Sequence, residues 1–547
     1  MTTDRNRPSL KVVQGGPPGK EDERPTIEIV PGLLPDIVDA AESALVLADH
    51  RVYQMGGMLV RPAESGELDA QDSDGLERPA GAPRLIMLGA VALRDILTRA
   101  IRWTKFDGRR GAQVEIDCPM AVAHALVERR QWPRLPELTG YVEAATVRPD
   151  GSLIATRGYD RRTGLYVTQD ACIPTTIPSA DALSRDAALT AADLIYGLYD
   201  TFPFRGGEDR AAAVAAVMTF LYARALPAVP LVAVTATAPG TGKTMLIDGC
   251  AIVATGRPCA VMAPGSDGAE LEKRLGAALL SGDSPLSLDN MERPLHGEVL
   301  CQAISQTALS VRPLGGSAIV RAPSRVALAA TGNNLILRGD LNRRVMLIRL
   351  DAQVEHPEQR RFGGRDHLAE MAAARPQLIE AALTITASYV AAGYPDVECP
   401  PLGGFGQWDR LVRRPLIWAG YPDPLAPAAA GRDDDPDRAA MIALLAAWRD
   451  RYGDQAVTAA EVVADAVRGS PRFDGGGTDL ESPALHEAVA QAAADRGNRI
   501  TARRLGYALR RWHGRIGDGM RLQRAGSRNA ANLTAWKVVE VDPGDRR

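Results

Sequence analysis

A glycine-rich stretch in the middle of the chain has the residue types and the setting of a phosphate-binding loop. An apolar run, 231–236, precedes it, and a helical pattern that starts with Met245 follows it. Backbone N–H groups at the start of a helix bind phosphates, a lysine adds a positive charge, and a hydroxyl binds Mg²⁺. Thr237 stands where the full phosphate-binding pattern has its first glycine. This departure weakens the match to the pattern more than it weakens the phosphate-binding chemistry of the loop. We expect ATP to be bound by Pro239, Gly240, Thr241, Gly242, Lys243 and Thr244.

A carboxylate at the end of a later apolar run is placed to hold the Mg²⁺ ion that such a loop requires. Asp289 follows the run 286–288 and lies 46 positions after Lys243. An isolated Asp-Asn pair is commonly a turn, but the preceding strand pattern favours the metal role. Asn290 stands where many ATPases have a glutamate that polarises water. Because an amide cannot accept a proton, we expect hydrolysis to be slow or to use another base.

Two further groups follow in an order that suits phosphoryl transfer. Asn333 follows the apolar run 326–331 by two positions and could contact the γ-phosphate or the attacking water. Arg343 and Arg344 directly precede the next apolar run. Alone, this pair would be interpreted as solvated charges. After such an asparagine, the order favours an arginine finger that reaches the phosphate of a neighbouring subunit.

The C-terminal part carries the clearest local positive charge. From residue 496 to 528 there are ten arginines and one acid, Asp518, although the whole chain has a net charge of −3. A solvated helix usually mixes charges of both signs, so this cluster favours contacts with DNA phosphates. The arginines expected on or beside one recognition helix are Arg503, Arg504, Arg510, Arg511 and Arg515.

Length and composition limit the classes of protein to consider. At 547 residues the chain has room for two to four domains, and its 64 basic and 67 acidic residues give no global field for nucleic acid. Six widely spaced cysteines without a C-x-x-C pair argue against a disulfide framework or a zinc site and for a reducing cytosol. The N-terminus lacks a signal-peptide core and no apolar run reaches membrane length, which predicts a cytoplasmic protein.

Apolar runs alternate with helical patterns around the phosphate-binding loop, which predicts an α/β protein with a parallel, doubly wound sheet. The expected strands are 231–236, 259–263, 286–289, 326–331 and 345–350. Upstream, we expect helices at 33–49, 90–104 and 121–130, strands at 52–61 and 84–88, and a hairpin around Asp150-Gly151. Downstream, we expect one helix over 365–393, a helix at 501–515 with Thr501 as its N-cap, and paired strands at 520–523 and 533–541.

These patterns divide the chain into seven parts. The predicted parts are a disordered tail (1–27), an N-terminal α+β accessory domain (28–178), a helical connector (179–228), a nucleotide-binding core (229–352), a helical lid region (353–425), a linker (426–437) and a winged-helix DNA-binding domain (438–547).

The residues described above carry a resemblance to known proteins. The loop 238–244 resembles that of AAA+ P-loop ATPases, and the order of loop, Asp289, Asn333 and the arginine pair is similar to superfamily 3 helicases. The sequence most resembles the primase-helicases of prophages and integrative elements. This resemblance is strongest over residues 140–425 and faint before them. The additional strings that carry it are Asp150-Gly151-Ser152, Gly158-Tyr159-Asp160, Phe202-Pro203-Phe204, Thr331-Gly332-Asn333-Asn334, Gly404-Phe405, 408–413 and Trp418.

The resemblance implies roles for several of these residues. Asn333 would be the sensor, Arg343 or Arg344 the finger, and Arg410 or Arg413 a lid arginine. In superfamily 3 helicases a hairpin between the metal strand and the sensor strand lines the pore of a ring and grips single-stranded DNA. The corresponding interval here, 309–321, would form a hairpin around Gly315-Gly316. Arg312 and Arg321 would then contact phosphates; the alternative is a surface hairpin with ordinary charges.

The combined prediction is a ring-forming, hexameric DNA helicase or translocase that uses ATP and Mg²⁺ for replication of a mobile genetic element. It would hold single-stranded DNA in its pore and duplex DNA on its winged helix. A primase or another replication protein is a candidate partner. Two alternatives remain open: an ATPase that loads or remodels proteins on DNA, and an ATP-binding, DNA-bound switch with little turnover. Asn290 keeps the second alternative open.

Overall fold

The computed structural model divides the chain into two compact units, Met1–Ala428 and Ala429–Arg547. It describes residues 24–47, 50–63, 76–176, 179–263, 268–312, 319–354, 356–359, 364–428, 436–471, 478–494, 499–528 and 533–541. The predicted tail therefore lies mostly outside the described residues, as do the Gly315-Gly316 turn and the middle of the predicted linker.

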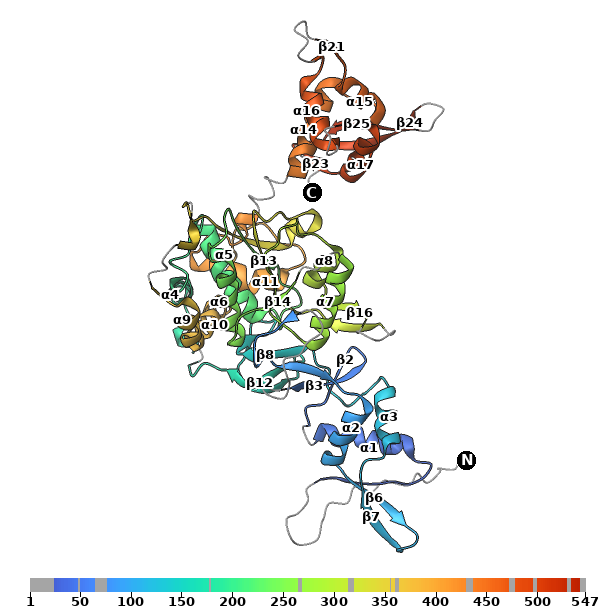
Figure 1. Ribbon diagram of the computed structural model, residues 1–547. Coiled ribbons are helices and arrows are strands. Elements are labelled where there is room, and N and C mark those ends of the chain that lie inside the picture. The colour runs from blue at the N-terminus through green and yellow to red at the C-terminus, as the bar shows by residue number, and fades with distance from the viewer. Residues whose placement is uncertain are drawn as a thin grey trace. The chain divides into compact units, whose positions relative to one another are not determined.

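The first unit is built around a six-stranded, mostly parallel sheet. Its order is β19-β13-β18-β15-β14-β4, and only β4 runs antiparallel to its neighbour. Figure 1 shows β13 and β14 between helices α5 and α6 and helices α7 and α8. The bounds are β4 Leu76–Glu77, β13 Leu231–Ala236, β14 Ala260–Met262, β15 Leu286–Leu288, β18 Leu328–Asn333, β19 Val345–Leu350, α5 Gly207–Tyr222, α6 Lys243–Thr255, α7 Gly268–Ser281 and α8 Glu298–Ser305.

The five strands predicted from apolar runs are confirmed as the parallel part of this sheet. Their residues are buried almost throughout, as expected for parallel strands covered by helices on both faces. The sixth strand, β4, was not predicted. It comes from the N-terminal part and pairs with Val261 and Met262 of β14. Two residues are too few to give a sequence pattern, so only the neighbouring strand makes this segment a strand.

Short sheets and helices make up the rest of the N-terminal part. The sheets have the orders β1-β6-β7, β2-β3-β5, β11-β12-β8 and β10-β9. The bounds are β1 Thr26–Glu28, α1 Leu34–Leu47, β2 Tyr53–Met55, β3 Met58–Ala63, β5 Arg84–Met87, α2 Ala90–Ala100, β6 Arg102–Asp107, β7 Ala112–Ile116, α3 Met120–Glu128, β8 Gly140–Ala144, β9 Thr146–Val147, β10 Leu153–Ile154, β11 Gly158–Asp160 and β12 Leu165–Cys172.

Two predictions for this part were wrong in extent. The helix expected over 90–104 ends at Ala100, because the following residues pair with β1 and β7 as strand β6. The strand expected over 52–61 is a hairpin, β2–β3, that turns at Gly56 and Gly57, both with positive φ. The hairpin around Asp150-Gly151 is confirmed, since β9 and β10 pair antiparallel.

Helices before and after the core complete the first unit. They are α4 Arg185–Gly197, α9 His367–Ala373, α10 Arg375–Ala391, α11 Gly406–Trp408 and α12 Arg414–Ala419, with a π-helical turn over Asp409–Arg413 and short 3₁₀ turns over Ala180–Ala182, Gly339–Arg343 and Pro357–Gln359. The single helix predicted over 365–393 is two helices. The break falls at Ala374, and Pro376 lies at the start of α10, where a missing N–H costs nothing.

The second unit packs helices on a small antiparallel sheet of order β20-β25-β24-β23. Trp448, Trp512 and Trp536 lie in its core. Thr501 caps α17, because its hydroxyl accepts a hydrogen bond from Arg504 N, and the predicted strand pair is confirmed as β24–β25. The bounds are α14 Pro436–Tyr452, β20 Val457–Thr458, α15 Ala459–Ala466, β21 Gly469–Pro471, β22 Thr478–Leu480, α16 Pro483–Ala493, α17 Ala502–Trp512, β23 Ile516–Gly517, β24 Met520–Arg528 and β25 Leu533–Glu540.

A buried ion pair ties β4 to the core sheet. Arg78 follows β4 directly and donates to Asp283 from Nε at 2.8 Å and from Nη2 at 2.7 Å. Both side chains are only 4% exposed. Breaking such a pair leaves a charge buried without its partner, which is strongly destabilising.

We therefore expect Arg78→Ala to lower the free energy of unfolding by about 3–5 kcal/mol, measured by chemical denaturation of the full chain. Arg99→Ala is the matched control, because Arg99 pairs with Asp95 in solvent, with side chains 75% and 63% exposed. Its effect should be much smaller. Equal effects of the two variants would show that β4 is not held in this way.

Candidate functional site

The predicted phosphate-binding loop connects the carboxyl end of β13 with the start of α6. β13 ends at Ala236, and α6 begins at Lys243. Gly240 and Gly242 have φ values of +73° and +93°, in the region that side chains avoid, so glycine is required for the loop to turn tightly. Gly242 is the N-cap of α6, which leaves the first N–H groups of this helix available to an anion.

Four of the predicted site residues lie together at this edge of the sheet. Lys243 Nζ donates to Asn333 Oδ1 at 2.7 Å and to Ala238 O at 3.3 Å. Thr244 Oγ1 donates to Asp289 Oδ1 at 3.1 Å. The order β13-β18-β15 causes this convergence, because parallel strands present their carboxyl ends at one edge. Asn333 lies opposite Ala236 in the β13–β18 register.

The site also contains a residue whose contact was not predicted. Thr331, on β18, donates its hydroxyl proton to Asp289 Oδ1 and accepts a hydrogen bond from Asn290 N at 3.0 Å. The Thr331 hydroxyl therefore orients the Asp289 carboxylate. The string Thr331-Gly332-Asn333-Asn334 was recognised in the sequence, but only the β15–β18 pairing shows which group Thr331 meets.

The local environment acts on the charge of Lys243. Partial burial lowers the pKa of the Lys243 ammonium, and the nearby Asp289 carboxylate opposes this shift. The charge is thus partly removed from water and paired with an amide oxygen rather than a carboxylate. Such a cation is stabilised when an anionic phosphate binds next to it.

Asn290 adopts a left-handed backbone conformation, with φ of +51°. Asparagine is among the few residues besides glycine that tolerate this region. Its side chain is exposed, and its backbone N–H is held by Thr331. The residue at this position is therefore suited to the turn that follows β15.

The donor set at the loop fits Mg²⁺. A hard cation prefers oxygen ligands, keeps several waters and takes the rest of its shell from phosphates. Thr244 Oγ1 and Asp289 Oδ1 are hydroxyl and carboxylate oxygens within 3.1 Å of each other. Within the described ranges, no group of three or more His, Cys, Asp or Glu side chains is arranged to hold a metal ion.

Arg343 and Arg344 both pair with Asp340 of the preceding 3₁₀ turn. Arg343 Nε and Arg344 Nε donate to different oxygens of this carboxylate. The Arg343 side chain is 60% exposed and that of Arg344 is 17% exposed. The Asp340 partner was missed, although its spacing of three and four residues from the arginines could have indicated it.

The hairpin predicted between the metal strand and the sensor strand is confirmed. β16 Ala308–Val311 pairs antiparallel with β17 Val320–Pro323, and Ser310 lies opposite Arg321. Arg312 follows β16 directly, and both Arg312 and Arg321 are exposed. Residues 313–318, which include the expected turn, lie outside the described residues.

The arginines predicted to bind DNA line α17 of the second unit and the turn after it. Arg503 and Arg510 lie over the ring of Tyr507, at 5.9 and 4.7 Å from its centroid. Tyr507 is 56% exposed and was missed in the sequence. The other three have protein partners: Arg504 donates to Ala494 O at 2.8 Å, and Arg511 and Arg515 pair with Asp437.

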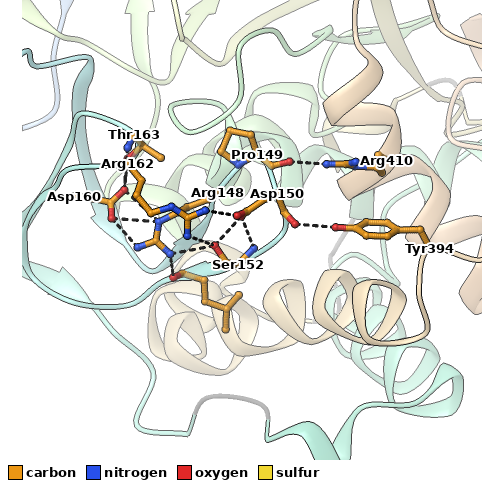
Figure 2. A network of polar contacts seen from close by, with 10 residues as sticks. Arg148, Pro149, Asp150, Ser152, Asp160, Arg162, Thr163, Tyr394 and Arg410 are labelled. Atoms are coloured by element: carbon orange, nitrogen blue, oxygen red, sulfur yellow. Dashed lines mark hydrogen bonds and ion pairs between the residues drawn. The ribbon is translucent and has the colours of Figure 1, made fainter.

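The upstream strings Asp150-Gly151-Ser152 and Gly158-Tyr159-Asp160 form a polar network (Figure 2). Arg148 donates to both oxygens of Asp160, and Asp150 accepts from Ser152 and Arg162. Hydrogen bonds from Ser152 hold the pKa of Asp150 below its ordinary value. These motifs thus shape the β9–β10 turn.

The same network attaches this turn to the segments after the core. Tyr394 donates to Asp150 O at 2.8 Å, and Arg410 donates to Pro149 O at 2.9 Å (Figure 2). Arg413 is buried and donates to Asp409 and Asp423. Both arginines expected at the lid therefore make contacts within the first unit.

Comparisons with known proteins give little to set beside this geometry. No family model and no curated protein matches the chain. Among solved structures, the apo A form of the NrS-1 C-terminal region matches with a TM-score of 0.30 and 10% identity, and it covers 82% of this chain and 98% of that one. No helix in the described residues has both the length and the apolar character to cross a bilayer.

Thr331→Val tests whether Thr331 positions Asp289. The valine keeps the shape but cannot hydrogen-bond, so we expect binding of ATP with Mg²⁺ to weaken by about 10-fold, as for residues that orient metal ligands. Thr331→Ser should restore most of the affinity. Binding of ATP without Mg²⁺ should change little in either variant, and an equal loss with and without the metal would contradict this role.

Proposed function

We propose that this chain is an AAA+ P-loop ATPase of the superfamily 3 helicase type that moves along DNA during replication of a mobile element. One observation carries the proposal: Lys243, Thr244, Asp289 and Asn333 converge at the carboxyl edge of one parallel sheet, within direct hydrogen-bonding contact. A phosphate-binding lysine, a metal-binding hydroxyl and carboxylate, and a polar amide are the groups that phosphoryl transfer needs.

The residues divide the work as follows. The N–H groups at the start of α6 bind the β- and γ-phosphates, and Lys243 gives up its bond to Asn333 to contact them. Thr244 and Asp289 would hold Mg²⁺, which would supply positive charge to neutralise the phosphate oxygens. Asn333 is then free to orient the attacking water. Asn290 cannot take the proton from this water, so the acceptor is another group or the phosphate itself.

The position of Arg343 favours a ring-shaped oligomer. Its guanidinium lies on an exposed 3₁₀ turn before β19, where it could reach a nucleotide on a neighbouring subunit. A group supplied in this way requires head-to-tail contacts, which close into a ring such as a hexamer. In the same proposal, residues 28–178 are the accessory domain, 179–228 a connector, 229–352 the motor, 353–425 the lid and 438–547 a winged helix.

DNA would bind at two places. The β16–β17 hairpin carries Arg312 and Arg321 toward a single strand in the pore. Helix α17 presents Arg503, Tyr507 and Arg510 on one face, where guanidinium groups stack on an exposed ring and suit a duplex backbone. The second candidate function is an ATP-bound switch on DNA, which the amide at Asn290 favours.

Lys243→Ala tests the nucleotide site. It removes the charge that holds the β- and γ-phosphates, so ATP hydrolysis should fall to background while the thermal unfolding midpoint stays near that of the wild type. Asp289→Ala should do the same through loss of the metal ligand. Wild-type turnover in either variant would exclude the assignment. If the wild type hydrolyses ATP but separates no forked substrate, the loading or switch function becomes the better account.

Mixing two inactive variants tests whether Arg343 or Arg344 acts between subunits. A subunit with Arg343→Ala and Arg344→Ala keeps its own loop, and a Lys243→Ala subunit keeps its finger. Mixed rings contain some interfaces with both parts, so partial ATPase activity should return. A finger contributes roughly 10³–10⁵ in rate, which makes the recovery measurable. Active protein that sedimented as a monomer would rule this out.

A further inference from the structure

A cleft of about 680 Å³ lies where the β2–β3 hairpin meets the base of the β16–β17 hairpin. The two hairpins belong to the same unit, and Figure 1 shows β16 beside β2. Ligand sites commonly have volumes of about 300–1,000 Å³, so the cleft is large enough to hold a small ligand or part of a chain. Its lining includes Gly56, Gly57, Glu137, Thr307, Arg321 and Arg325.

The main chain of one hairpin is pressed against the other. A Cβ at Gly56 would lie 2.1 Å from the carbonyl oxygen of Arg321, which is closer than any side chain can approach. Gly57, the next residue of the same turn, has open space around its Cβ position. Gly56 therefore allows the contact that fixes the backbone of Arg321 at the wall of the cleft.

The charges of the lining favour an anion. Among the described residues, the lining contains two guanidinium groups, Arg321 and Arg325, and one carboxylate, Glu137. Within the described residues neither arginine forms an ion pair, although the Glu137 carboxylate raises the pKa of Arg325 and so partly opposes the effect of burial. Burial lowers the pKa of Arg325, so the protein leaves this cation partly desolvated and incompletely compensated. An entering anion would supply the missing partner.

The chemistry of the lining points to phosphate. Guanidinium groups match phosphate oxygens in a bidentate geometry, and Thr307 adds an exposed hydroxyl. None of the described residues of the lining is aromatic, so they offer no ring on which a base could stack. Recognition would then depend on the backbone of a nucleic acid and not on its sequence.

We propose that this cleft binds a phosphate group through Arg321 and Arg325, and that the phosphate belongs to a single DNA strand at the base of the hairpin. The proposal rests on the proposed function in taking DNA as the source of the phosphate. It assigns the N-terminal part a direct role, because the Gly56-Gly57 turn forms one wall of the site. A free nucleotide offers the same chemistry, and the test separates the two sources.

Two substitutions of opposite effect test the site. The full-length protein without ATP is titrated onto a labelled oligo(dT) strand over a series of salt concentrations. Arg325→Ala should weaken binding by about tenfold and reduce the salt slope by about 1, because one phosphate contact is lost. Glu137→Gln removes the one carboxylate among the described lining residues and should tighten binding. Misfolding cannot produce a gain.

Matched controls address general charge and strain. Arg109→Ala removes an exposed arginine on the β6–β7 turn, outside the cleft, and should leave affinity for the strand unchanged. Gly56→Ala should weaken binding by displacing the β16–β17 hairpin. Gly57→Ala, at the same turn and also with positive φ, should weaken it much less. Equal effects of the two glycine variants would speak against the wall of the cleft described above.

The outcomes separate this proposal from the function of the motor. Oligo(dT) binding is measured without ATP, so it does not depend on the Lys243 site. If Arg325→Ala and Glu137→Gln both bind the strand as the wild type does, the proposal is overturned even if ATP hydrolysis is intact. A second titration uses dTMP, which lacks the β- and γ-phosphates. If Arg325→Ala binds dTMP more weakly than the wild type does but binds oligo(dT) equally well, the cleft is assigned to a free nucleotide. The proposal that it binds a DNA strand is then overturned.

Discussion

The pairing of β13 with β18, and of β18 with β15, is the constraint on which the candidate site depends. Because the three strands run parallel, the loop after Ala236, the amide of Asn333 and the carboxylate of Asp289 come to one edge of the sheet. The strands are buried, so their register cannot slip without exposing apolar side chains. The geometry of the site is therefore held by the core rather than by the polar contacts themselves.

Under the proposed function, those polar contacts would change partners when nucleotide binds. Lys243 is held by an amide oxygen and Asp289 by two hydroxyl groups, and neither is locked in a salt bridge with the other. A neutral partner is displaced more easily than an opposite charge, so in the proposed mechanism phosphate and Mg²⁺ would enter without breaking an ion pair. The arginine pair differs, since both guanidinium groups pair with the one carboxylate of Asp340, which would have to release Arg343 before a finger could act.

The N-terminal part is joined to the core in several independent ways. It adds strand β4 to the sheet, inserts the Arg78–Asp283 pair, and presses Gly56 against the β16–β17 hairpin. The network around Asp150 makes a further connection, to Tyr394 and Arg410. Each attachment joins residues far apart in the sequence. Under the proposed function, a movement of the core around bound nucleotide would therefore displace the N-terminal part as well.

Local patterns determined the loop, the five parallel strands, the hairpin at 308–323 and the capped helix α17, because apolar periodicity, glycine and capping residues act over a few positions. They also suggested Asp289 and Asn333, since strand ends are visible in a sequence. Only the tertiary structure decided that α2 ends at Ala100, that two residues at 76–77 form a strand, that Thr331 meets Asp289, and that Arg325 lies near Glu137. These outcomes depend on partners dozens to hundreds of residues away, whose approach is set by burial of the whole core and leaves no periodic signal in the chain.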